Sequence, residues 1–150
     1  DAACDWGSAS SDGWRRGAEA MDLTGRLEVE QVLALYGHLV DAQAWDRFDE
    51  VFTEDAAFDA SALQLPRMEP RSGIQEGFAS MGHPVAHLTT NLVVEADGAD
   101  GATVLSKFLC PLRGGKVLTG TYADVVVRTD AGWRIRERVV TVLRPREDTL

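Results

Sequence analysis

Four segments between residues 85 and 143 decide the fold: VAHLTTNLVVE (85–95), ATVLSKFLCPL (102–112), VLTGTYADVVVR (117–128) and WRIRERVVTVL (133–143). Each is rich in β-branched and apolar residues, which is typical of a strand. The connections are short and rich in Gly and Asp, as hairpins require: DGADG (97–101), RGGK (113–116) and TDAG (129–132). The stretch therefore predicts a meander of four antiparallel strands.

The residues before this stretch follow a helical period instead. Apolar side chains between Val29 and Val40 recur at helical spacing, which predicts a helix over 25–44 with Thr24 as its N-cap. A second short helix with Trp45 on its apolar side, a short strand at 56–60 and a third helix at 73–81, capped by Ser72, are expected next. Helices followed by a meander indicate an α+β domain with a curved antiparallel sheet.

Composition limits the class of protein. The 150 residues suit one domain, and the formal net charge of −9 argues against nucleic acid and against an anionic membrane as partners. The chain contains no run of about 18 apolar residues, so no membrane span is predicted. Its two cysteines lie far apart in the sequence and do not form a disulfide framework. A cytoplasmic location is therefore expected. Residues 1–21 are predicted to be an N-terminal extension, pinned by Trp6 or Trp14, and 22–150 the folded domain.

Acid–base chemistry is the kind of catalysis that remains after the other motifs are excluded. The chain has no glycine-rich phosphate loop, no histidine spacing for a metal and no nucleophile elbow, so neither a metal nor another cofactor is predicted. His87 and Asn91 share one face of the first strand, and Asp41 lies at the edge of the buried helix face. If Asp41 meets His87 in a pocket, the carboxylate can orient the imidazole for proton transfer. Otherwise His87 is a buried structural histidine with its hydrogen bonds made inside the protein, and Asn91 only satisfies backbone groups at an irregularity of the strand.

The last strand carries three arginines at alternate positions. Strict alternation turns Arg134, Arg136 and Arg138 outward and Trp133 toward the core. On the neighbouring strand, Asp124 could pair with one of these arginines across the sheet.

The order of short motifs resembles a known family, the SnoaL-like branch of the nuclear transport factor 2-like superfamily. The motifs are Tyr-x-x-x-x-Asp-x-x-x-Trp (Tyr36, Asp41, Trp45), Phe52-Thr53-Glu54-Asp55-Ala56, His-x-x-x-Asn (His87, Asn91), Gly120-x-Tyr122-x-Asp124 and Gly132-Trp133-Arg134-Ile135-x-x-Arg138. The resemblance implies a cone-shaped barrel, in which a strongly bent antiparallel sheet wraps around N-terminal helices and leaves a pocket at the open end.

The resemblance also implies site residues. In relatives such as scytalone dehydratase, bile-acid 7α-dehydratase and hexachlorocyclohexane dehydrochlorinase, an Asp–His pair abstracts a proton so that a leaving group departs. Asp41 and His87 match that pair, and Tyr36 and Arg138 match further catalytic positions, although Arg138 needs a bulge to turn inward. The residues expected to bind substrate are Asn91, Trp45, Phe58 and Tyr122.

The function that follows is a cofactor-free dehydratase or other lyase, isomerase or cyclase, acting on a small hydrophobic alicyclic or polyketide-like substrate. Two alternatives remain: a non-catalytic binding or assembly module with the same cone, and an epoxide hydrolase of the limonene epoxide hydrolase type. Asp124 and Arg138 resemble only a part of the Asp–Arg–Asp arrangement of that enzyme. A homodimer or higher homo-oligomer is expected through apolar strand faces that carry Val125, Val127, Val140 and Val142.

Overall fold

A computed structural model describes residues 21–144, and the prediction for residues 1–20 lies outside them. The helices are α1 (Leu23–Asp41) and α2 (Arg71–Ser80), with short 3-10 helices η2 (Trp45–Glu50) and η3 (Ser61–Leu63). The strands are β1 (Phe52–Asp59), β2 (Leu88–Ala96), β3 (Gly101–Pro111), β4 (Val117–Thr129) and β5 (Gly132–Val142). The predicted order of helices followed by a meander is confirmed.

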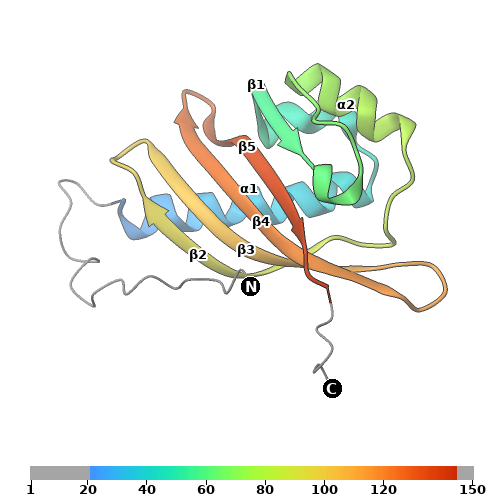
Figure 1. The fold of residues 1–150 in the computed structure, drawn as a ribbon. Coiled ribbons are helices and arrows are strands. Elements are labelled where there is room, and N and C mark those ends of the chain that lie inside the picture. Colours follow the sequence, from blue (N-terminus) through green and yellow to red (C-terminus); the bar gives the residue numbers. More distant parts are fainter. Residues whose placement is uncertain (1–20, 145–150) are drawn as a thin grey trace.

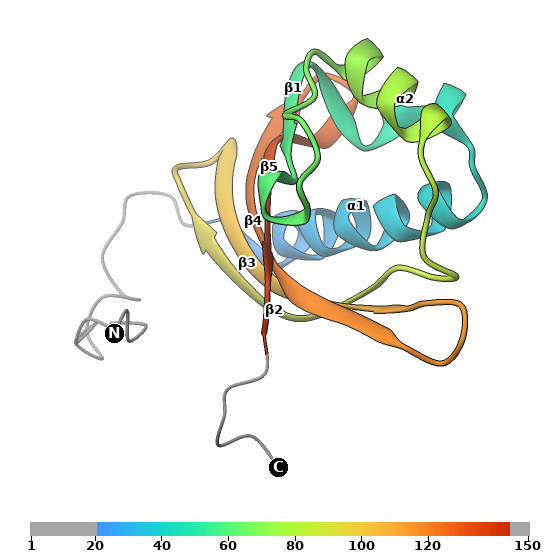
Figure 2. The ribbon, with the colours of Figure 1, turned by 45° about the vertical axis from the view of Figure 1, so that its right-hand side comes forward.

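The sheet has the order β1-β5-β4-β3-β2, and its last four members form the predicted antiparallel meander. The remaining strand, β1, pairs parallel with β5. The sheet is therefore mixed, whereas a wholly antiparallel sheet was expected. It is strongly bent, and α1 and α2 lie on the same side of it (Figures 1 and 2). The cone is unclosed, because β1 and β2 are its two free edges.

Both predicted helix caps were wrong by two residues. Asp22 caps α1, and its carboxylate accepts a hydrogen bond from the backbone N–H of Gly25 at 2.7 Å. Pro70 occupies the N-cap position of α2 and makes no side-chain cap. Aspartate and threonine are both good caps, so the short stretch before α1 offers two starting points, and the sequence alone does not choose between them.

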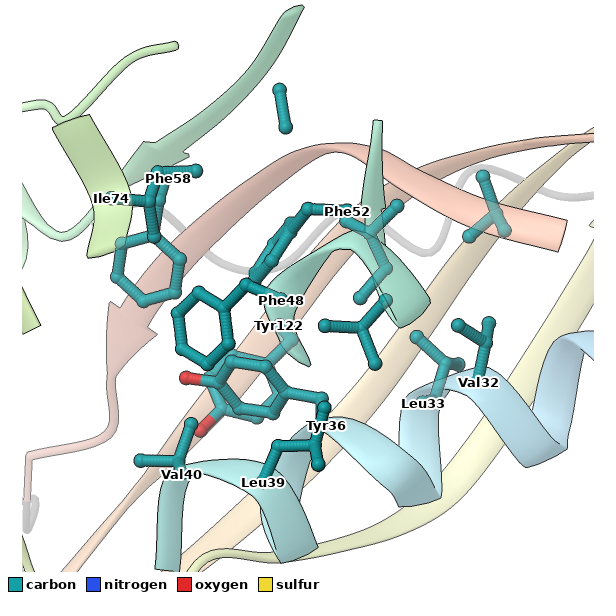
Figure 3. Packing of buried hydrophobic residues seen from close by; sticks show 14 of the residues in the cluster. Val32, Leu33, Tyr36, Leu39, Val40, Phe48, Phe52, Phe58, Ile74 and Tyr122 are labelled. Atoms are coloured by element: carbon teal, nitrogen blue, oxygen red, sulfur yellow. The ribbon is translucent and has the colours of Figure 1, made fainter. Parts of the chain in front are cut away.

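The core lies between α1 and the concave face of the sheet. Tyr36 and Leu33 of α1 are almost completely buried, as are Trp133 and Ile135 of β5, so the prediction that Trp133 faces the core is confirmed. The strand β5 packs against α1. Figure 3 shows the aromatic part of this cluster gathered around Tyr36. The core therefore fixes one face of α1 against the sheet, and with it the direction of the last turn, where Asp41 lies.

Two bulges reverse the strand alternation that the sequence predicts. The pairing of β5 with β4 shifts by one residue at Arg136. Trp133 and Ile135 are buried before the shift, and Arg138 and Val140 after it. An extra residue turns the following side chains to the opposite face. The bulge that Arg138 needed in order to face inward is thus present.

The second bulge lies in β2. Its pairing with β3 shifts between Thr90 and Val93, and Asn91 adopts a left-handed φ of 53°. After the shift, Leu92 and Val94 pack against the core, whereas Val93 is 50% exposed. The expected common face of His87, Asn91 and Val93 is therefore wrong, since the bulge breaks it.

The outer face of the sheet carries apolar residues beside Glu95 and Glu137, and these apolar residues differ from the expected ones. Val93 and Leu105 are about half exposed, and Val125 and Val139 line a shallow groove beside Leu105. Val140, which was expected on this face, is buried on the inner one because of the bulge at Arg136.

No helix among residues 21–144 is long and apolar enough to cross a membrane.

Candidate active site

A cavity of about 330 Å³ opens between the helices and the concave face of the sheet. Its volume is at the lower end of the range for small-molecule sites. Most of its lining is aliphatic or aromatic, and the polar side chains are two tyrosines, two histidines and one cysteine: Tyr36, Tyr122, His83, His87 and Cys110. No charged Asp, Glu, Lys or Arg side chain among residues 21–144 lines it.

Asp41 and His87 meet at the edge of this cavity. Asp41 is the last residue of α1, and His87 stands immediately before β2. The Asp41 Oδ1 and His87 Nδ1 atoms are 2.7 Å apart, and the backbone N–H of His87 donates to Asp41 Oδ2 at 3.2 Å. The expected hydrogen-bond contact between the two residues is confirmed. The imidazole is 8% exposed and the carboxylate 31%, so the acid faces solvent and the ring faces the protein.

The hydrogen bond decides the tautomer of His87. A carboxylate only accepts, so Nδ1 carries the proton, and Nε2 keeps a free lone pair. Burial lowers the pKa of His87 from its usual value, and this outweighs Asp41, whose hydrogen bond and charge raise it. His87 is therefore a neutral imidazole at pH 7. Its free nitrogen has no partner among the described residues, which is what a general base requires.

Gly37 allows α1 to approach His87. It lies one turn before Asp41 on the same helix, and a Cβ atom at this position would be 2.6 Å from the backbone oxygen of His87. Such a distance is too short for any side chain. The last turns of α1 thus hold His87 through three contacts, one with the glycine surface and two with the carboxylate.

Two tyrosines form the polar floor of the cavity. The rings of Tyr36 and Tyr122 meet edge to face at 6.0 Å, and their hydroxyl ends point the same way in Figure 3. Burial raises the pKa of Tyr36 to about 12, although the positive charge of Arg138 partly offsets it. Burial also raises the pKa of Tyr122. Both phenols stay protonated at neutral pH, so they can donate hydrogen bonds to a ligand oxygen.

Arg138 lies beneath these tyrosines and is completely buried. Its guanidinium stands 4.1 Å from the centre of each tyrosine ring, and it donates two hydrogen bonds to Asp124, at 2.7 and 2.8 Å. Burial alone would lower the pKa of Arg138, but Asp124 and the two tyrosines together raise it. The cross-strand pair that the sequence suggested is thus Asp124–Arg138, in the interior and not on the surface.

The other predicted site residues divide into two groups. Phe58 and Tyr122 line the cavity, as expected of substrate-binding residues. Trp45 and Asn91 do not: the Trp45 ring packs behind the cavity against Phe48, and Asn91 is exposed at the bulge in β2. Arg138 also stays outside the lining, because the two tyrosines cover it.

His83 lines the cavity and was missed as a site residue. From the sequence, His83 was weighed only as a metal ligand, and no metal was predicted. One signal was available: His83 and Pro84 lie in the short segment that leads to His87. Residues 21–144 contain no cluster of three or more potential metal ligands. Cys110 lines the cavity as a small buried residue, and burial raises its pKa to about 11, so it is a weak nucleophile.

The family follows from a comparison of the whole domain. A profile described as SnoaL-like domain matches residues 21–139. The chain belongs to the SnoaL-like family. The motif order that suggested this family is therefore confirmed, and the SnoaL-like protein has the bent sheet and helical layer of nuclear transport factor 2-like folds.

Relatives of this SnoaL-like protein are similar over nearly their whole length. An uncharacterised protein of Mycobacterium tuberculosis is 34% identical over 135 residues, which cover 80% of this chain and 86% of the relative. A crystal structure from Novosphingobium aromaticivorans, described as a candidate aromatic ring hydroxylase, is 31% identical with a TM-score of 0.69, over 84% of this chain and 94% of that one. Another from the same species, described as a candidate scytalone dehydratase, is 18% identical with a TM-score of 0.66, over 85% and 90% of the two chains, and shares the fold.

Proposed function

We propose that this SnoaL-like protein is an acid–base enzyme that removes a proton from a carbon atom of a small, uncharged and mainly apolar substrate. The observation that carries the proposal is the 2.7 Å contact between Asp41 and His87 at the edge of an apolar cavity. Asp41 orients the ring and stabilises the imidazolium that forms, and the free Nε2 of His87 takes the proton. The class is a lyase, isomerase or cyclase.

The polar floor supports a substrate that carries a carbonyl group. When His87 takes a proton from the carbon beside that carbonyl, the electron pair moves into an enolate. Its oxygen accepts hydrogen bonds from the hydroxyl groups of Tyr36 and Tyr122. In an elimination, the pair then expels a group from the next carbon, and the imidazolium returns its proton to the leaving group. In an isomerisation, the same proton returns to a different carbon.

The lining supports the expected substrate class. A cavity of about 330 Å³ without a charged side chain favours a neutral alicyclic or polyketide-like molecule of one or two rings. A substrate with a carboxylate or phosphate would lose its hydration without gaining a counter-ion there.

The two alternatives receive less support. A non-catalytic module would be favoured by a filled pocket or by a wide separation of Asp41 and His87, and neither is observed. An epoxide hydrolase built on Asp124 and Arg138 needs both side chains in the pocket. They are instead paired with each other beneath the tyrosines.

The test is solvent exchange at the carbon next to a carbonyl. A panel of cyclic ketones and β-hydroxyketones is incubated with the protein in D₂O, and deuterium uptake or loss of water is followed by NMR. His87→Ala should slow the exchange about 100-fold or more, which is the ordinary contribution of a general base. Asp41→Asn should also slow it, because the amide can accept or donate and no longer selects the tautomer.

Two variants serve as matched controls. His38→Ala removes an exposed histidine from the same helix, and Asp55→Asn removes an exposed carboxylate. Both should exchange at the rate of the unaltered protein. If His87→Ala keeps the full rate while its circular dichroism and melting temperature are unchanged, His87 is not the base, and the proposal fails.

A further inference from the structure

His83 is a polar side chain of the cavity that the proposed reaction does not use. It lines the same cavity as His87, and the two ring centres are 6.2 Å apart. The carbonyl oxygen of Phe78 lies 2.8 Å from its Nε2 atom. Because a carbonyl only accepts, Nε2 carries the proton of the neutral ring, and Nδ1 of that ring has a lone pair.

The ring of His83 is held in place on two sides. It packs at 5.0 Å against the ring of Trp45 and at 5.3 Å against the ring of Phe78, tilted by 37° and 34°. The chain at Trp45 is itself tied to α2, since the side chain of Gln75 donates to its backbone oxygen at 2.6 Å. Rotation of the ring would break the hydrogen bond to Phe78 and both packing contacts.

The free nitrogen of His83 is open to a ligand. Within residues 21–144 its Nδ1 atom has no hydrogen-bond partner, and this atom is not completely buried. A rigid acceptor in an otherwise apolar wall selects for a donor, because an apolar group placed against it leaves the acceptor unpaired.

We propose that His83 is a specificity residue that accepts a hydrogen bond from a hydroxyl group of the substrate. The cavity then combines two kinds of polar group: phenols that donate to a carbonyl oxygen, and a fixed imidazole that accepts from a hydroxyl. The substrate class becomes a hydroxylated cyclic ketone. The hydroxyl group at His83 stays in the product, because a hydroxyl that donates a hydrogen bond to a base is not activated as a leaving group. This inference rests on the proposed function, which places the substrate in this cavity.

The test is a binding measurement and needs no turnover. Calorimetry compares α-tetralone, its ring-hydroxylated derivatives and the matching ring-methoxylated derivatives on the full chain. At one ring position, the hydroxyl compound should bind about three- to tenfold more tightly than the methoxy compound, the ordinary contribution of one neutral hydrogen bond.

The variants assign that preference to one side chain. His83→Phe keeps a flat ring against Trp45 and Phe78 and should bind both compounds equally. His83→Asn puts an amide oxygen near the position of Nδ1 and should restore part of the preference. His87→Ala should keep the preference. A preference that persists in His83→Phe, or that disappears in His87→Ala instead, overturns the inference, as does equal binding of all pairs by the unaltered protein.

A second measurement holds even if His83→Phe fails to fold. Long-range ¹⁵N NMR of the unaltered protein should show the Nδ1 resonance of His83 shift when the hydroxyl compound binds and not when the methoxy compound does. An unchanged resonance contradicts the inference. A hydroxyl preference without any deuterium exchange would refute the proposed reaction and support the role of His83.

Discussion

Gly37→Ala is the substitution that most sharply separates helix propensity from the geometry of the site. Alanine in a helix interior is more stable than glycine by about 0.5–1 kcal/mol. At Gly37, however, the added Cβ would stand 2.6 Å from the backbone oxygen of His87, whereas ordinary contact begins at 3.4 Å. The helix and the segment before β2 must therefore separate by about 0.8 Å.

That separation acts directly on the Asp41–His87 contact. The hydrogen bond from the His87 backbone to Asp41 is 3.2 Å long, so a further 0.8 Å would exceed hydrogen-bond range. Overpacking costs about 1–3 kcal/mol, which exceeds the gain in propensity. We expect a net loss of up to about 2.5 kcal/mol of unfolding free energy from these two ranges, and a fall in kcat/KM of up to about 100-fold.

Gly73→Ala is the matched control. Gly73 lies in α2, and a Cβ atom there would meet no atom within 4 Å. This variant should be as stable as the unaltered protein or more so, with unchanged kcat/KM. Urea unfolding and deuterium exchange measure both quantities. If Gly37→Ala is also stabilised and fully active, the close approach of α1 to His87 has no functional importance, and the reasoning is refuted.

Four further predictions concern the buried pair, the pH dependence of activity, the pH dependence of stability and the outer face. Arg138→Met should cost about 3–5 kcal/mol in urea unfolding, because it leaves Asp124 buried and unpaired, and Arg138→Met with Asp124→Leu should recover part of the loss; an additive double variant would argue against a coupled pair. Because burial lowers the pKa of His87 below its usual 6.5, kcat/KM should rise with pH through a midpoint below 6.5, and Asp41→Asn should move the midpoint lower still; a midpoint above 6.5 would contradict this. The same shift makes the unfolded chain bind more protons just below pH 6.5, so unfolding free energy should fall there as pH falls, and His87→Phe should reduce that fall. We also propose that the outer sheet face pairs with a second copy: Leu105→Lys, at a 46% exposed position, should then lower the mass measured by light scattering, and an unchanged mass would count against it.

The sequence predicted the meander well because hairpin connections and strand periods are local signals. It could not predict the partner of β1, since a parallel pair with β5 joins segments that are about 80 residues apart and carries no turn signature. A short strand at 56–60 was expected, but its place in the sheet depends on the bend of the whole sheet.

The bulges explain the largest errors in the site. A strict period of two turned Arg138 outward and Asn91 inward, and one extra residue in each strand reverses both. Only the family resemblance suggested an inward Arg138, and it placed that residue among the catalytic groups. The structure shows the guanidinium already paired with Asp124 and covered by two tyrosine rings, so its charge acts on the phenols.

The sequence left the meeting of Asp41 and His87 open, and the family resemblance matched them to an Asp–His pair. The structure brings them together because α1 ends at Asp41 and β2 begins directly after His87. The role of His83 could not be predicted from the sequence, because it depends on a tautomer that the carbonyl of Phe78 selects, and on the packing of Trp45. The direction of the His87 pKa shift also needed the structure, since burial and the nearby carboxylate act in opposite senses.

The most direct test of the central claim is the double variant His87→Ala with Asp41→Asn, measured beside the two single variants in the deuterium-exchange assay. Residues that act as one unit are not additive. The double variant should therefore be no more than slightly slower than the slower single variant, and all three should keep their fold. Losses that multiply, or an undiminished rate in His87→Ala, would show that Asp41 and His87 do not form one acid–base unit.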